Sequence, residues 1–230
     1  MTPIDHLCAD VCQANLALVK HGLVTLTWGN ASALLRNEGL VAIKPSGVAY
    51  DTLTPDQIVI LDLSGKVVRG SLRPSTDAPT HLALYNAFPS VGAIVHTHST
   101  YASVFAQARR EIPCLGTTHA DHFAGPVPVT RQLSPAELAD YEHNTGRIII
   151  ERFASLDPVS VPAVLVAGHA PFAWGPSISN AVDNAVALEA VARMAHATLL
   201  LRPDAPSLEP HLLAKHHDRK HGANRYYGQR

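Results

Sequence analysis

The chain has 230 residues, of which 47% are hydrophobic and 16% charged, and its net charge is −1 at pH 7 with histidine neutral. A chain of this length and hydrophobicity can bury a substantial core. The balanced charge argues against a general nucleic-acid or membrane-surface binder, because both usually carry a basic excess. No apolar run reaches the roughly 18 residues that are needed to span a bilayer.

The N-terminus lacks the basic segment and apolar block of a secretion signal. The three cysteines, Cys8, Cys12 and Cys114, are few and odd in number, which does not suggest a disulfide framework. We therefore expect a reduced, cytoplasmic location.

The predicted elements of the first half of the chain are a helix, two β-rich runs, a hairpin with its turn at Ser64-Gly65, and a second helix. They lie at residues 4–20, 22–35, 39–47, 58–70 and 77–88. The second half continues with a strand, a helix, a Pro/Gly-rich stretch, a helix capped by Ser134 and Glu137, a strand, a long helix and a basic tail. These lie at residues 91–98, 100–108, 112–130, 134–146, 162–169, 179–201 and 211–230.

Helices and strands are mixed without a regular βα alternation. This favours an α+β fold, one sheet covered by helices, over a doubly wound parallel sheet. No repeat, linker or break in composition divides residues 1–230, so we expect a single domain. No P-loop or GxGxxG sequence is present, which argues against the standard nucleotide sites.

Histidine is unusually frequent, with 14 residues, and two of them end the strand predicted at residues 91–98. Successive side chains of a strand alternate between its faces, so His96 and His98 are expected to point the same way. His169 ends the strand predicted at residues 162–169, and it would complete a three-imidazole site if the two strands are neighbours. Three protein ligands with open positions are typical of a catalytic divalent metal, although such histidines can also hydrogen-bond backbone carbonyls.

Asp77, in the segment "RPSTDAPTH", has two interpretations. It directly precedes a predicted helix, so the local sequence favours a cap that accepts a backbone N–H. Alternatively, its carboxylate is a metal ligand or an acid–base group. Ser75 and Thr76 supply hydroxyl groups beside the same helix N-terminus, where an anion is favoured.

Two Gly-containing turns offer polar groups to a ligand. "KPSG" combines Lys44, the hydroxyl of Ser46 and the close backbone approach that Gly47 permits, which suits a phosphate, although an exposed turn is the default interpretation. "TWGNAS" presents Asn30 in a similar turn, where it is either structural or ligand-facing.

Two further clusters are candidates for proton transfer. Asp121 lies in a predicted loop with His119 and His122, where a proton relay and a solvated loop are about equally plausible. The basic tail ends near Tyr226 and Tyr227. It could bind nucleic acid, but it is short and isolated in a neutral chain, so a docked tail that positions a tyrosine is the alternative.

The motifs "HTHS", "GHAPFAWG", "TWGNAS", "KPSG" and "PSTDAPTH" together resemble the class II aldolase/adducin family, and the resemblance runs from about residue 10 to residue 229. "GTTHAD" and "RKHGANRYYGQ" are similar to the family's L-ribulose-5-phosphate 4-epimerase branch. The resemblance implies a three-layer α/β/α arrangement with a mostly antiparallel central sheet. It also implies epimerisation at carbon 4 of L-ribulose 5-phosphate, giving D-xylulose 5-phosphate. The alternatives are an aldolase acting on a related sugar phosphate and a non-catalytic, adducin-like interaction protein.

The resemblance also implies roles for individual residues. One divalent ion per subunit, zinc or else manganese or cobalt, is expected on Asp77, His96, His98 and His169. Substrate and its phosphate are expected on Asn30, Lys44, Ser46, Gly47, Ser75 and Thr76. The implied acid–base pair is Asp121 and Tyr227, with His216 as a further catalytic residue. A homotetramer is implied, with active sites between subunits that the segment 211–230 completes.

The chain departs from the epimerase pattern at four positions beside these motifs, namely His122, Ala124, Gly168 and His217. None of them removes an expected metal ligand or a member of the acid–base pair. The departures concern loop packing and substrate preference more than the chemistry.

Overall fold

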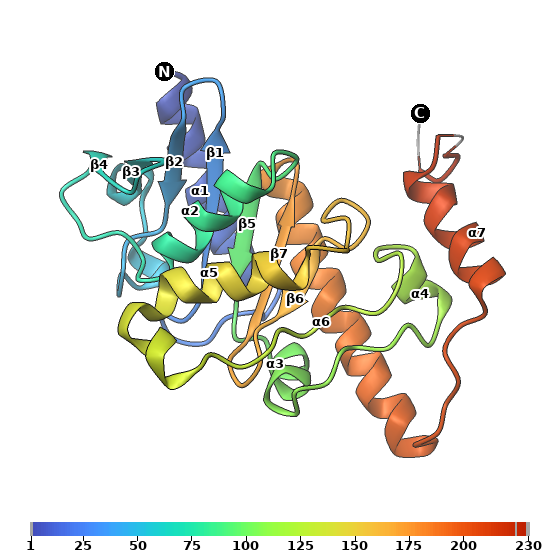
Figure 1. Cartoon of the computed structure of the whole chain (residues 1–230). Helices are drawn as coiled ribbons and strands as arrows, with labels where there is room; N and C mark the ends of the chain where they lie inside the picture. The colour runs from blue at the N-terminus through green and yellow to red at the C-terminus, as the bar shows by residue number, and fades with distance from the viewer. Residues whose placement is uncertain (1, 224, 229–230) are drawn as a thin grey trace.

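In the computed structural model, which describes residues 2–223 and 225–228, one seven-stranded antiparallel sheet lies between two helical layers (Figure 1). The strand order is β4-β3-β2-β1-β5-β7-β6. The strands are β1 (Asn30–Leu35), β2 (Leu40–Ile43), β3 (Val59–Asp62), β4 (Val67–Arg69), β5 (Ala93–His96), β6 (Ala163–Leu165) and β7 (Pro171–Gly175). The expected α+β class and three-layer arrangement are confirmed.

Two hydrophobic clusters fill the spaces between the sheet and the two helical layers. Helices α1 (Pro3–Lys20), α3 (Thr100–Gln107) and α6 (Ile178–Leu201) share one cluster with the small sheet residues Ala31, Val95 and Ala173. Helices α2 (Ala78–Ala87) and α5 (Tyr141–Arg152) share the other with the larger residues Ile94 and Trp174. The side chains of adjacent strand residues therefore point to opposite faces of the sheet, as the alternation of side chains along a β-strand requires.

The remaining helical elements lie mainly in connections and in the C-terminal segment. They are the 3₁₀ turns η1 (Tyr50–Thr52), η2 (Pro55–Gln57) and η3 (Pro135–Asp140), the short helix α4 (Thr117–Ala120) and the helix α7 (Pro210–His221). Helix α7 stands beside α4 at the edge of the molecule in Figure 1, and the two helices are in contact. The basic tail thus forms a helix docked on the chain, the alternative that the tyrosines suggested.

Several local predictions are confirmed. The hairpin of β3 and β4 turns at residues 63–66, where the Gly65 amide donates to the Asp62 carbonyl at 3.0 Å. The capping box of Ser134 and Glu137 is present, although it begins the 3₁₀ helix η3 instead of an α-helix. In the described part of the chain, no helix combines the length and hydrophobicity of a membrane span.

The two histidine-bearing strands are shorter than predicted. Strand β5 ends at His96, which pairs with Phe172 of β7. The next partner along β7 is Pro171, which has no N–H to continue the ladder, so His98 lies in the following loop. His169 likewise lies in the turn between β6 and β7. The two segments are nevertheless neighbours, because β5 pairs with β7.

Candidate functional site

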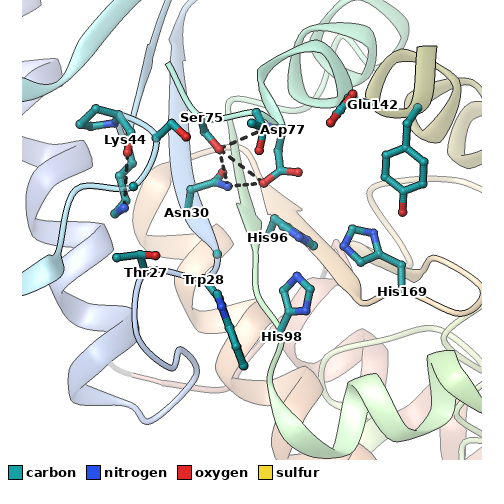
Figure 2. A pocket seen from close by; sticks show the side chains of 16 residues that line it. Thr27, Trp28, Asn30, Lys44, Ser75, Asp77, His96, His98, Glu142 and His169 are labelled. Carbon is teal, nitrogen blue, oxygen red and sulfur yellow. Dashed lines mark hydrogen bonds between the residues drawn. The ribbon is translucent and has the colours of Figure 1, made fainter. Parts of the chain in front are cut away.

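One cavity of about 400 Å³ gathers the predicted metal and phosphate residues at one end of the sheet. Its lining contains Asn30, Lys44, Ser46, Gly47, Ser75, Thr76, Asp77, His96, His98 and His169. Figure 2 shows the three histidines on one side of this cavity and Lys44 on the other, with Asn30, Ser75 and Asp77 between them. Residues that are up to 139 positions apart (169 − 30) therefore share one site.

The three histidines converge closely enough to share one metal ion. One ligand nitrogen from each of His96, His98 and His169 lies within 4.8 Å of the others. Their ring centroids are 5.0 Å apart in all three pairs. His96 is buried, whereas His98 is exposed, which leaves the cluster open toward the cavity. Three imidazoles with an open side are the donor set of a catalytic divalent metal site.

Hydrogen bonding and burial keep the histidine nitrogens available to a metal. The Nδ1 atom of His96 is 2.9 Å from the Pro171 carbonyl, which can only accept, so Nδ1 carries the proton and Nε2 keeps its lone pair. Burial, together with the neighbouring His96 and His98, lowers the pKa of His169 to about 4. A neutral imidazole is the form that binds metals.

Asp77 precedes α2 but does not cap it through its side chain. Its Oδ2 atom instead accepts from Asn30 Nδ2 at 2.7 Å, and Ser75 Oγ lies 3.4 Å from the same oxygen. Burial opposes ionisation of this carboxyl, but His96 and the Asn30 amide outweigh it and lower its pKa. The carboxylate is therefore ionised and held in the cavity, as a metal ligand would be.

The turn before Asn30 needs a glycine. Gly29 has φ +79°, and a Cβ atom there would lie 2.7 Å from the His96 carbonyl oxygen. The Tyr50 hydroxyl also lies 2.9 Å from the Trp28 carbonyl and 2.8 Å from that of Gly29. These contacts hold Asn30 beside the end of β5, where it reaches Asp77.

The opposite end of the cavity is suited to an anion. Lys44 is 2% exposed, and its Nζ atom lies 4.7 Å from the centre of the Tyr50 ring. No carboxylate within the described residues forms an ion pair with it, and burial lowers its pKa. Gly47 has φ +69° in the same turn, a backbone conformation that glycine adopts without strain. A buried cation beside hydroxyl groups favours a phosphate.

Asp121, His216 and Tyr227 do not line this cavity in the same chain. They gather instead where α7 packs on α4. The Asp121 carboxylate accepts from Arg219 Nε at 2.8 Å and lies 3.1 Å from His216 Nδ1. Burial opposes ionisation, but these two partners lower the pKa of Asp121. The Arg219 guanidinium also lies 5.3 Å from the Tyr227 ring, which is 61% exposed.

Six further residues line the cavity and were missed as site residues, namely Thr27, Trp28, Gly29, Pro45, Tyr141 and Glu142. Trp28 lies beside the histidines, with its ring centroid 6.0 Å from that of His98. Tyr141 and Glu142 form the first turn of α5, whereas the sequence predicted a single helix from residue 134, where the structure has the separate 3₁₀ helix η3. The sequence offered two signals for these residues. Trp28 is close to Asn30 in the same turn, and Tyr141 and Glu142 form a "YE" pair just before the apolar positions of α5.

Of the four departures from the epimerase pattern, Gly168 is the nearest to the metal ligands. It has φ +75° in the β6–β7 turn and donates its amide to the Ala106 carbonyl at 2.8 Å. His122 and Ala124 follow α4, and the His217 ring stacks on that of His221 in α7 at 4.7 Å. None of the four lines the cavity.

Comparison with known proteins agrees with this geometry. Residues 9–196 match the family described as the Class II Aldolase and Adducin N-terminal domain. The chain is 52% identical over 228 residues to L-ribulose-5-phosphate 4-epimerase UlaF of Salmonella typhi, with 99% of this chain and 100% of that protein covered. The enzyme of the same name from Salmonella choleraesuis is equally similar, with the same coverage.

Solved structures have the same fold. An L-fuculose 1-phosphate aldolase superposes with a TM-score of 0.80 at 25% identity, covering 93% of this chain and 95% of that one. An aldolase II superfamily protein from Pseudomonas syringae gives a TM-score of 0.77 at 16% identity, covering 96% and 86%, a likeness of fold alone. The chain belongs to the class II aldolase and adducin family.

Proposed function

We propose that the protein is a divalent-metal-dependent L-ribulose-5-phosphate 4-epimerase. The observation that carries the proposal is that one cavity joins a three-histidine and aspartate cluster to a buried lysine that has no carboxylate partner among the described residues. A metal at one end and an anion site at the other suit a phosphorylated sugar whose carbon chain is cleaved and rejoined. The full-length likeness to enzymes named as this epimerase supports L-ribulose 5-phosphate as the substrate.

An aldolase that acts on a related sugar phosphate is the second candidate, favoured by the likeness to L-fuculose 1-phosphate aldolase. It would use the same metal and phosphate ends of the cavity. The two activities differ in what leaves the site, because an aldolase releases two fragments and an epimerase rejoins them. The 52% identity to the epimerases, against 25% to that aldolase, favours the epimerase.

The reaction explains why a metal is needed. Carbon 4 of the substrate carries no acidic C–H, so deprotonation there cannot invert it. A base can instead remove the proton of the 4-hydroxyl, after which the C3–C4 bond breaks to leave glycolaldehyde phosphate and the enediolate of the ketone fragment, which keeps the electron pair of that bond. The aldehyde turns over, the bond re-forms on its other face, and an acid protonates the new oxygen. A divalent metal, when bound, supplies a Lewis acid that stabilises the negative charge on the ketone fragment.

Different residues of the cavity would bind the metal and the phosphate. Asp77, His96, His98 and His169 would hold the metal. Lys44, with the Ser46–Gly47 turn and the hydroxyl groups of Ser75 and Thr76, would hold the phosphate, so that the aldehyde rotates without escaping. Asn30 orients Asp77 through its 2.7 Å hydrogen bond. Zinc is the proposed metal because three imidazoles and one carboxylate suit it, while manganese and cobalt are alternatives.

Asp121 and Tyr227 are the proposed acid–base pair, supplied to the cavity by a second copy of the chain. Asp121 directly follows α4 and Tyr227 follows α7, and their position away from the cavity of their own chain supports this arrangement. The Asp121 carboxylate would transfer a proton on one face of the aldehyde and the Tyr227 hydroxyl on the other, with His216 beside Asp121. A homotetramer would repeat such an interface around its axis. A cytoplasmic location stays a prediction.

The test is to incubate the purified protein with L-ribulose 5-phosphate and Zn²⁺, Mn²⁺ or Co²⁺. Formation of D-xylulose 5-phosphate supports the proposal. Accumulation of the two fragments identifies the aldolase instead. A metal-loaded protein that produces neither would refute both.

A further inference from the structure

A buried histidine next to the cavity has no role in the mechanism above. His81 lies in the first turns of α2 and is fully buried, and its amide donates to the Asp77 carbonyl at 3.1 Å. Residues four apart on a helix lie on the same face. Phe172 packs against the rings of both His81, at 5.8 Å, and His96, at 4.2 Å. His81 therefore lies directly behind the proposed metal ligands.

A buried hydroxyl chain reaches the far side of this ring. Ser32 Oγ lies 2.7 Å from His81 Nδ1 and 2.7 Å from the Tyr85 hydroxyl. Ser32 is 0% exposed and Tyr85 is 1% exposed, so water does not replace either bond. The three groups form a single line from Tyr85 through Ser32 to His81.

The arrangement of hydrogens in this line decides where His81 carries its proton. Tyr85 and Ser32 have one hydroxyl hydrogen each, and leaving either unpaired in the core costs free energy. Both are used only if Tyr85 donates to Ser32 and Ser32 donates to Nδ1. His81 then carries its hydrogen on Nε2. Among the residues that the structure describes, this buried Nε2 atom has no hydrogen-bond partner.

Asp77 offers the matching acceptor. Within the described residues, its side-chain hydrogen bonds all end on Oδ2, which faces Asn30 and Ser75, so Oδ1 is free to accept. We propose that His81 is a positioning residue whose Nε2–H donates to the Asp77 carboxylate when that group ligates the divalent metal. The inference rests on the proposed function only in taking Asp77 as a metal ligand. Such outer hydrogen bonds orient the ligands of a metal and strengthen its binding.

The test measures metal affinity, not turnover. Apo-protein is titrated with Co²⁺, and the visible spectrum gives both the dissociation constant and the coordination signature. His81→Phe keeps an aromatic ring but removes Nε2–H, and it is expected to weaken Co²⁺ binding by about 10- to 100-fold. His81→Gln retains an N–H donor and is expected to restore most of the affinity. Tyr85→Phe is the matched control, because it removes a hydroxyl of the same buried line without removing Nε2–H.

A merely structural His81 gives a different pattern. The inference requires that His81→Phe loses Co²⁺ affinity while its apo-protein melts no lower than that of Tyr85→Phe. Wild-type affinity in His81→Phe overturns it. If this variant does not fold, His81→Asn decides, since its shorter amide can pair with Ser32 but does not reach the position of Nε2, and it is expected to lose about tenfold in affinity; no loss overturns the inference. His96→Asn tests the proposed metal site independently of His81, because Co²⁺ binding that survives this substitution would refute the metal site itself.

Discussion

Replacing Lys44 by methionine should separate phosphate binding from the chemistry of the sugar. Methionine fills a similar volume without the charge. Lys44 is buried, and in the described part of the chain it has no carboxylate partner, so a ligand phosphate is its natural counter-ion. We expect kcat/KM for L-ribulose 5-phosphate to fall by about thirtyfold and that for unphosphorylated L-ribulose to stay nearly unchanged.

The magnitude follows from the burial of the ammonium group. Two unit charges 4 Å apart attract by about 4 kcal/mol at an effective dielectric constant of about 20. Desolvation of the phosphate removes part of this, and hydrogen bonds to charged groups contribute about 1.5–3 kcal/mol net. A central value of about 2 kcal/mol corresponds to about thirtyfold, since about 1.4 kcal/mol is a factor of ten.

The assay compares the two substrates in wild type, Lys44→Met and Lys66→Met. Lys66 lies exposed in the β3–β4 turn, so its variant controls for a general loss of positive charge. Equal losses on both substrates would show that Lys44 supports the fold or the metal site instead. Unchanged kinetics with the phosphorylated substrate would refute the assignment of this end of the cavity.

Lys44→Met should lower activity, but it should stabilise the ligand-free protein, because it removes a buried charge. Burial lowers the pKa of Lys44 from its ordinary value of 10.5, so the unfolded chain binds the proton more tightly than the folded one. The free energy of unfolding of the ligand-free protein should therefore rise with pH between the lowered pKa and 10.5. Lys44→Met should flatten this rise. Urea unfolding with and without the substitution, at fixed protein concentration, measures it.

Three further predictions address the metal, the second subunit and the buried core. His96→Asn should lose bound metal and activity while keeping its circular dichroism spectrum. Tyr227→Phe should keep metal but lose most of its catalytic rate. Mixing the two variants should restore activity if each cavity takes its tyrosine from a neighbouring copy of the chain. Gly29→Ala should be destabilised by about 2 kcal/mol and lose metal, because its Cβ atom would lie 2.7 Å from the His96 carbonyl oxygen; a wild-type melting temperature would contradict this. Burial lowers the pKa of His119 from 6.5 to about 4, so the stability it contributes is present above pH 6.5 and is lost as pH falls toward 4. His119→Gln should reduce that slope in urea titrations.

Much of the local structure could be predicted because its causes are local. Apolar periodicity and caps indicated α1, α2 and α6, and turn residues indicated the β3–β4 hairpin. The lack of regular alternation indicated α+β. The spacing of His96 and His98 after one apolar run, with His169 after another, indicated a shared metal site, although only His96 lies within a strand.

Other features depended on contacts between distant segments. Local sequence favoured Asp77 as a helix cap, but its carboxylate instead reaches Asn30, 47 residues earlier. Strand β5 ends at His96 because Pro171, the residue of β7 next to its partner Phe172, has no N–H to continue the ladder, which no local pattern could reveal. The burial of Lys44 is likewise set by the packing around its turn.

The sequence by itself determined which residues are chemically competent and which local elements carry them, because hydrophobic periodicity and turn chemistry act over a few residues. The tertiary structure decided which competent residues meet. It brought His169 to His96 through the β5–β7 pairing and placed Tyr141 and Glu142 on the same cavity. It also docked α7 on α4, so that Asp121 lies with Arg219 and away from its own chain's histidines. Strand pairing and helix docking depend on the packing of the whole chain, which no short stretch of sequence contains.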